Sequence, residues 1–162
     1  MRRLAAAALA LLAGCGGPTR EPPAPLAFEG LPVAGDLAFA QRSGFTDCWE
    51  DTTAMRCRRA GVMLLGFGPY NGAVDLDGSN GGGGFDQLIL WNDWDQDSFL
   101  PVLAALKERG WKVCYTGQGN RGDQGIYRHE GVAARISIDL SYWGKRRLRI
   151  IPDTTGGGET GC

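Results

Sequence analysis

Three aspartates, each separated from the next by one residue, are the side chains best placed for chemistry: Asp93, Asp95 and Asp97. Paired carboxylates are the groups with which many hydrolases donate and accept protons. Carboxylate oxygens are also the ligands that Ca²⁺ prefers, although a calcium site needs six or more oxygens and this group alone does not supply them. A simpler interpretation is an acidic loop whose last member caps a helix and whose charges favour its N-terminus.

A second acidic group follows part of the spacing of an EF-hand calcium loop. Asp75, Asp77 and Asp86 stand at positions 1, 3 and 12, with Ser79 at position 5. Position 6 is Asn80 where the sharp turn needs glycine, and position 12 is not the bidentate Glu. The two acidic groups are therefore only weak candidates for metal ligands, and the sequence predicts neither a metal site nor a cofactor.

Other catalytic patterns are absent from the sequence or occur in the wrong context. His129 is the single histidine, and no Ser-x-x-Lys or Gly-x-Ser-x-Gly occurs. The segment 117–122 matches G-x-G-x-x-G, which binds dinucleotides only where a helix follows the strand. A strand pattern follows here, so this segment is predicted to be a hairpin loop. We expect a non-enzymatic protein rather than an enzyme.

Basic side chains concentrate near the C-terminus and could form a stripe on the outer face of a sheet. They are Lys145, Arg146, Arg147, Arg149 and, on the neighbouring strand, Arg135. Such a stripe could bind an anionic lipid or glycan, but Asp139 would share and offset it, so a solvated face is the favoured interpretation. The net charge of −1 gives no reason to expect nucleic acid as a partner.

Four cysteines other than Cys15 predict two disulfides in an oxidising compartment. They are Cys48, Cys57, Cys114 and Cys162. Cys48 and Cys57 are the natural pair because a short loop closes at little entropic cost, and their spacing is not a zinc pattern. Cys114 and Cys162 would then form the second bridge. The alternatives are free thiols, or a Cys162 that stays free or pairs between molecules while Cys114 is a buried thiol.

One helix stands out in the sequence. Asp97 or Ser98 can cap it, Pro101 is tolerated in its first turn, and Gly110 ends it. Phe99, Val102, Leu103 and Leu106 form one apolar face.

Apolar runs and alternation predict strands on both sides of this helix. The segments are 60–67, 73–77 and 85–91 before it, and 111–116, 126–129, 132–140 and 147–150 after it. A turn is expected over 68–72, a short strand over 37–40 and a helical turn over 46–50. The predicted fold class is α+β, with a single antiparallel-rich sheet of about six or seven strands and one main helix packed on it.

The N-terminus has the form of a secretory signal, with Arg2 and Arg3 before the apolar run 4–13. Leu12-Ala13-Gly14-Cys15 resembles the lipobox of bacterial lipoproteins. That resemblance implies cleavage before Cys15, acyl chains on Cys15 and a membrane anchor in the cell envelope. Gly16 is not the aspartate that retains many lipoproteins in the inner membrane, so the outer membrane, facing the periplasm, is implied in a Gram-negative cell. An ordinary secretory peptide is the alternative.

The predicted organisation is a signal peptide over 1–14, the lipidated Cys15 with a proline-rich tether over 15–36, an α+β domain over 37–155 and a glycine-rich tail over 156–162. We expect an envelope lipoprotein whose small non-catalytic module binds or supports another envelope component, a protein or a glycan. The alternatives are a cell-wall-directed hydrolase that uses Asp93, Asp95 and Asp97, and a Ca²⁺-stabilised module.

Overall fold

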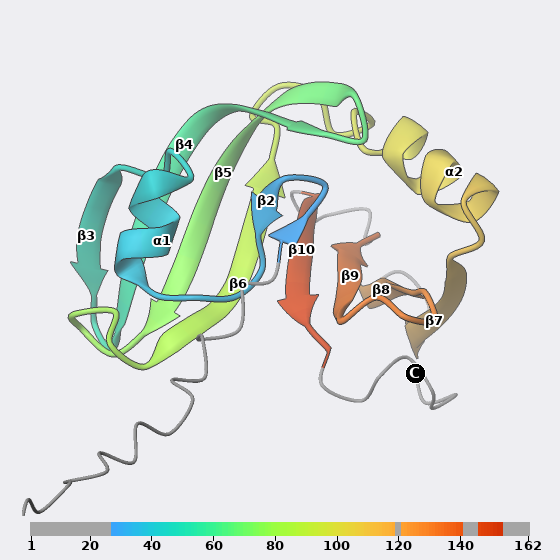
Figure 1. Ribbon diagram of the computed structural model, residues 1–162. Coiled ribbons are helices and arrows are strands. Elements are labelled where there is room, and N and C mark those ends of the chain that lie inside the picture. The colour runs from blue at the N-terminus through green and yellow to red at the C-terminus, as the bar shows by residue number, and fades with distance from the viewer. Residues whose placement is uncertain (1–26, 119–120, 141–145, 154–162) are drawn as a thin grey trace, which may run out of the picture.

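A computed structural model describes residues 27–118, 121–140 and 146–153 (Figure 1). They form an eight-stranded sheet, a two-stranded sheet and two helices. The small sheet pairs β1 (Ala27–Phe28) with β2 (Leu31–Pro32), and the helices are α1 (Leu37–Arg42) and α2 (Leu100–Glu108). The strands of the large sheet are β3 (Asp47–Asp51), β4 (Ala54–Leu64), β5 (Phe67–Asp77), β6 (Gly84–Trp91), β7 (Lys112–Gln118), β8 (Arg121–Arg128), β9 (Ala134–Asp139) and β10 (Arg147–Pro152).

The large sheet consists of two antiparallel meanders joined along one edge. Its strand order is β3-β4-β5-β6-β10-β9-β8-β7, so each half contains four consecutive strands. The last strand of each half makes the junction, where β6 and β10 pair antiparallel. The chain passes from one half to the other through α2 (Figure 1). The described residues are mostly β, and the predicted antiparallel-rich sheet is confirmed in outline, with eight strands instead of six or seven and a second, two-stranded sheet.

The two faces of the large sheet differ in chemistry because side chains alternate along each strand. The inner face carries buried apolar residues such as Val74 on β5, Leu90 on β6 and Ile136 on β9. The outer face carries their neighbours in sequence, among them Asp75 on β5 and Arg149 on β10. The alternation predicted for Ala134, Ile136 and Ile138 is confirmed, since all three are buried.

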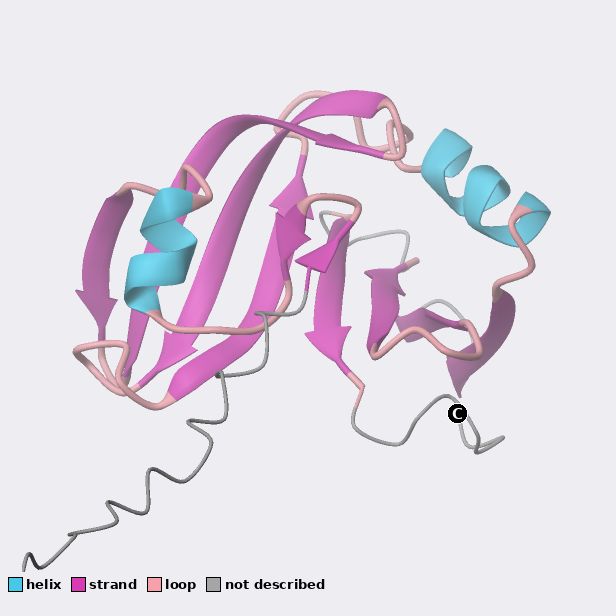
Figure 2. Ribbon diagram, in the orientation of Figure 1, coloured by secondary structure: helices cyan, strands magenta, loops and turns pink. Residues whose placement is uncertain are grey.

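The helix α1 and the β1–β2 hairpin lie over the inner face (Figure 2). The helix α2 lies next to the turn between β4 and β5, and its apolar side chains join the same buried cluster. Ala40 from α1 and Leu31 from β2 belong to the same buried cluster as the inner side chains of the sheet. The four apolar residues predicted for the main helix are all buried, and the Phe99 ring stacks on Tyr70 with centroids 4.5 Å apart. The core is therefore a single layer of side chains between the sheet and these elements.

The main helix begins later than the sequence predicts. Neither expected cap acts as one, because the Ser98 hydroxyl donates to Asp95 O and the Asp97 carboxylate pairs with Arg146. Phe99 takes the N-cap position without a side-chain hydrogen bond. Gly110 ends the helix with φ of +85°, as predicted.

Two short predicted elements near the N-terminus of the domain have the opposite structure. Residues 37–40, expected as a strand, begin α1, because Asp36 caps the helix through a 2.9 Å hydrogen bond from Phe39 N. Residues 46–50, expected as a helical turn, lie mostly in β3, which pairs residue by residue with β4. For residues 37–40 the capping signal of Asp36 was not recognised in the sequence. For residues 46–50 the pairing of β3 with β4 prevails over the local preference for a helical turn.

The first long hairpin turns at a different place from the predicted 68–72. The connection between β4 and β5 is Leu65-Gly66, and both residues have positive φ, of 55° and 86°. This is the backbone geometry that two-residue hairpin loops require. The Asn71-Gly72 pair, which resembles a turn in sequence, instead lies inside β5, with Gly72 packed between Val62 and Leu90.

The structured part of the chain begins before Leu37. The proline content of residues 15–36 predicts an extended tether, but Phe28, Leu31 and Val33 are buried in the core. Phe28 packs edge-on against Trp111, with ring centroids 5.4 Å apart. The β1–β2 hairpin therefore belongs to the folded unit. The predicted signal peptide, Cys15 and the glycine-rich tail lie outside the described residues.

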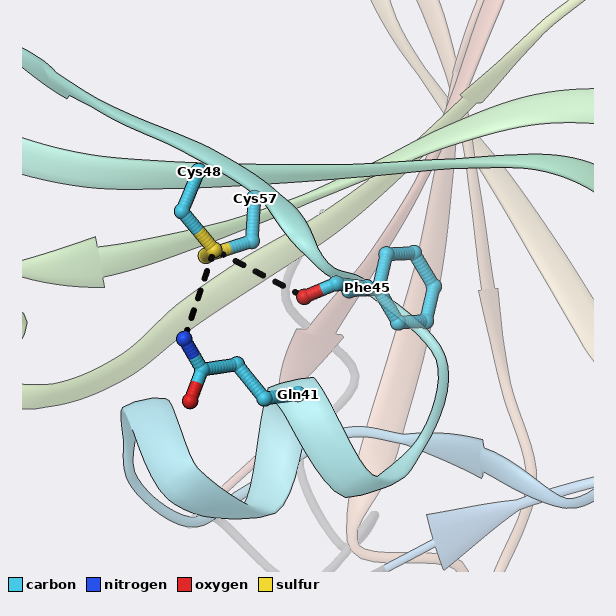
Figure 3. The surroundings of a disulfide bond; sticks show 4 residues. All are labelled: Gln41, Phe45, Cys48 and Cys57. Atoms are coloured by element: carbon cyan, nitrogen blue, oxygen red, sulfur yellow. Dashed lines mark hydrogen bonds between the residues drawn. A yellow bond between two sulfur atoms is a disulfide. The ribbon is translucent and has the colours of Figure 1, made fainter.

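A disulfide joins Cys48 on β3 to Cys57 on β4, as predicted (Figure 3). The two residues are directly opposed in the strand register, with Cα atoms 4.0 Å apart. Residues of α1 and of the following connection surround the bridge: Gln41 Nε2 lies 4.0 Å and Phe45 O 3.6 Å from Cys48 Sγ. Cys114 is also disulfide-bonded. Cys162 lies outside the described residues, so the Cys114–Cys162 bridge stays a prediction.

Within the described part of the chain, no helix is long and apolar enough to cross a membrane.

Candidate functional site

The three closely spaced aspartates lie in the loop between β6 and α2, and each binds a different partner. The Asp93 carboxylate accepts a 2.8 Å hydrogen bond from the Asn71 amide. The Asp95 carboxylate accepts from the backbone of Asp97, and Asp97 pairs with Arg146. The loop is held further because Arg146 N donates to Gln96 Oε1 at 2.6 Å. These contacts fix the loop against the start of β10, and the hydrolase interpretation gains no support from them.

The second acidic group occupies the outer face at the ends of β5 and β6. Asp75 is buried and bound by two groups: Arg56, at 2.6 Å from Nε to Oδ1, and the Gln87 amide, at 3.1 Å. Burial raises the pKa of Asp86, and the charges of Asp77 and Asp75 raise it further. Among the described residues, no three acidic, histidine or cysteine side chains are arranged to hold a metal ion.

His129 and the G-x-G-x-x-G segment, which the sequence also offered for consideration, are explained by packing and by chain connection. His129 packs beside Trp111, with ring centroids 5.7 Å apart, and its Nδ1 lies 2.7 Å from Glu130 O. The G-x-G-x-x-G segment belongs mostly to β7 and β8, which pair antiparallel, so the hairpin is confirmed but the strands extend into the predicted loop, and residues 119–120 lie outside the described residues. Both features are explained by packing or chain connection.

The predicted basic stripe is present only in part. Arg147 and Arg149 lie on the outer face of β10, and the Arg149 position is paired with Ser137 of β9, two residues from Arg135. Arg146 does not join them, because its side chain binds Asp97 and Gln96 O. Lys145 lies outside the described residues. The cations of β10 instead contribute to a site that the sequence did not predict.

A broad open depression of about 790 Å³ lies on the outer face of the sheet, over β4, β5, β6 and β10. Its floor is low because Ala73, which faces outward from the central strand there, has only a methyl group. Arg58 from β4 stands on one side, and Trp91 from β6 and Arg147 from β10 stand on the other. We call this surface the outer-face depression. Neither helix nor the β1–β2 hairpin, within the described structure, packs on that face.

The guanidinium of Arg58 lies close to two indole rings. Its guanidinium carbon lies 4.4 Å from the centroid of Trp49 on β3 and 5.7 Å from the centroid of Trp91. Attraction between a guanidinium and indole faces is worth about 0.5–2 kcal/mol, depending on desolvation. The rings therefore orient this cation without neutralising its charge.

The arginines of the outer-face depression differ in how their charges are compensated. Arg56 is paired with Asp75 and Asp51, and the hydrogen bond to Asp75 raises the pKa of Arg56 against the opposing effect of burial. Arg59 donates to the backbone oxygen of Ser43 at 2.9 Å. Arg58 and Arg147 form no ion pair with any described carboxylate. Two cations without an ion pair, which we call uncompensated, are therefore left facing solvent, with Asp47 opposite Arg58 in the strand register.

Neutral and acidic groups complete the lining of the outer-face depression. Thr46 and Asn71 offer a hydroxyl and an amide, while Asp47 and Asp93 offer carboxylates that accept hydrogen bonds. The arrangement can therefore bind an anionic group at the arginines and neutral hydroxyl or amide groups between them.

Sequence reasoning missed Arg58, Trp49 and Trp91 as site residues. They come from three strands, and only the register of β3, β4 and β6 across β5 brings them together. The one available signal was the alternation of Arg56 and Arg58 around Cys57, which places both arginines on one face of a strand.

Comparisons with protein-family models, with curated proteins and with solved structures found no match for this chain.

Proposed function

We propose that the protein is a membrane-anchored envelope lipoprotein whose domain binds another envelope component through the outer-face depression. The anchor rests on the resemblance of residues 12–15 to a lipobox, with acyl chains on Cys15. The observation that carries the binding role is a sheet face with two uncompensated arginines beside tryptophan, on the side away from both helices. The acidic loop supports the site from one edge, since the Asp93 side chain is held by Asn71.

Anchoring is tested by Cys15→Ser. The substitution should abolish acylation, because the thiol is the acceptor, and should leave an unprocessed precursor. Mass spectrometry of the N-terminal peptide and membrane fractionation measure both effects. Recovery of the wild-type protein in a detergent-free soluble fraction, with no acyl mass on Cys15, would contradict the anchor.

Binding is tested by capture of envelope components on the full chain and on an Ala73→Leu variant. The larger side chain rises from the floor of the outer-face depression and removes no charge, so the captured material should decrease several-fold. The matched control is Ala38→Leu, the same substitution on the exposed surface of α1. Equal capture by all three proteins would contradict a role for this face.

A further inference from the structure

The outer-face depression has features that point to one class of ligand. Arg58 and Arg147 lie on β4 and β10, which are separated by β5 and β6. Three strand spacings correspond to about 14 Å between the backbones. The Arg58 side chain covers part of this span, since its guanidinium carbon lies 5.7 Å from the ring of Trp91 on β6. The depression of about 790 Å³ is much larger than a small isolated anion, whereas an extended chain that lies across the strands can occupy it.

The balance of charges restricts how acidic that chain is. Asp47 and Asp93 line the same depression as the two uncompensated arginines. A densely charged polyanion would meet these carboxylates as well as the arginines, and like charges in close contact are unfavourable. Sparse negative charge fits better, with neutral groups next to the aspartates.

The remaining lining suits hydroxyl-rich rings. Carboxylates accept hydrogen bonds from hydroxyl groups, and the Asn71 amide and the Thr46 hydroxyl can donate or accept. Trp91 lies between the two arginines along the path across the sheet, where its ring can contact an apolar sugar face.

We propose that the outer-face depression binds an acidic glycan, a sugar chain with an occasional carboxylate, and that Arg58 and Arg147 bind its carboxylates. The proposal rests on the proposed binding function and adds the ligand class. Arg58 is the principal anion receptor because Trp49 and Trp91 orient its guanidinium. Planar guanidinium groups bind carboxylates through paired hydrogen bonds. Arg147 is the second receptor at the far side of Trp91.

Calorimetric titration of the full chain in detergent tests the ligand class. The probes are the disaccharide N-acetylglucosaminyl-N-acetylmuramic acid, which carries one carboxylate, and chitobiose, which has similar rings without it. Inorganic phosphate is the third probe. The acidic disaccharide should bind at least about 10-fold more tightly than chitobiose, as expected for a charge-assisted hydrogen bond. Its affinity should fall as salt is added.

Three variants identify the residues. Arg58→Gln and Arg147→Gln should each weaken binding of the acidic disaccharide about 10-fold and leave binding of chitobiose unchanged. Ala73→Leu should weaken both sugars, because it fills the floor without changing the charge. Arg42→Gln, an equal change of charge on α1, should alter neither affinity. Circular dichroism and thermal melts check that each variant is folded.

Several outcomes would overturn the proposal. Equal affinity for the two disaccharides would show that the carboxylate is not recognised. Unchanged binding in Arg58→Gln would show that Arg58 and its tryptophan contacts do not take part in binding and only stabilise the sheet. Phosphate binding as tight as that of the acidic disaccharide would reduce the site to a simple anion site. If sugars do not bind but capture of a protein still depends on Ala73, the glycan inference fails and the proposed function stands. If neither sugar binding nor protein capture depends on this face, the glycan inference and the proposed binding function both fail.

Discussion

At the scale of single residues, the outer face of the sheet separates arginines that stabilise the fold from arginines free to bind. Arg56 and Arg58 are two positions apart on β4 and point to the same face. Arg56 is opposite Asp75, which completes a row with Gln87 on β6. Arg58 is opposite Ala73 on β5 and Asp47 on β3, and it forms no ion pair with that carboxylate. The partner on β5 therefore distinguishes the two arginines, because Arg56 meets a carboxylate there and Arg58 meets a methyl group.

The Asp75–Arg56 pair is expected to contribute strongly to stability. Asp75→Asn removes the charge of a side chain that is 5% exposed and leaves Arg56 without its main partner. The free energy of unfolding should fall by about 2–3 kcal/mol, measured by urea denaturation. Asp77→Asn, two residues along the same strand and exposed, should change it by less than about 0.5 kcal/mol. Equal effects of the two substitutions would contradict this account.

At the scale of elements, the sequence predicted best where the pattern is local. The main helix, its apolar face and its end at Gly110 follow from spacing and from one glycine, and the alternation in β9 is equally local. The turn at 65–66 was not predicted, because Asn71-Gly72 is the stronger turn signal in the sequence. The position of the turn depends on the pairing of β4 with β5, in which Leu64 is opposite Phe67. The outer-face depression could not be predicted for the same reason, since it depends on register among distant strands.

Contacts between Tyr70 and Ser98 attach the loop before α2 to β5. The Tyr70 hydroxyl donates to Ser98 O at 2.8 Å, and its ring is buried against Phe99. Burial, with a smaller effect from the charge of Asp95, raises the pKa of Tyr70 to about 12. The folded chain therefore holds this proton at pH values where the unfolded chain, with a tyrosine pKa of about 10, has released it.

Stability should consequently fall as the pH rises from about 10 to 12, because the unfolded state then binds fewer protons. In Tyr70→Phe this decline should be shallower, although Tyr127, whose pKa burial also raises, keeps part of it. At pH 7 the variant should lose about 1 kcal/mol with the hydrogen bond. Urea denaturation from pH 8 to 11.5 measures both effects, and parallel curves for the two proteins would refute the assignment.

At the scale of the whole molecule, the described structure is one folded unit that extends further toward the N-terminus than composition suggests. The β1–β2 hairpin contacts the second half of the chain, through Phe28 with Trp111 and through the Glu29–Arg109 ion pair at 2.9 Å. The prolines of residues 15–36 led to the prediction of a tether. Three apolar residues in this region, Phe28, Leu31 and Val33, nevertheless pack in the core. A short hairpin of two-residue strands gives almost no periodicity, which is why the sequence did not reveal it.

The extent of the folded unit can be tested with paired changes on either side of Ala27. Leu31 is 4% exposed within the core, so Leu31→Ala should lower the free energy of unfolding by about 2–4 kcal/mol, through lost burial and the cavity left behind. Deletion of residues 16–25, which the sequence predicts to be tether, should leave the melting temperature within about 2 °C of wild type. Thermal melts of the three proteins decide the matter. A small effect of Leu31→Ala would show that the β1–β2 hairpin is not part of the folded unit. A large effect of the deletion would show that residues before Ala27 contribute to the stability of the fold.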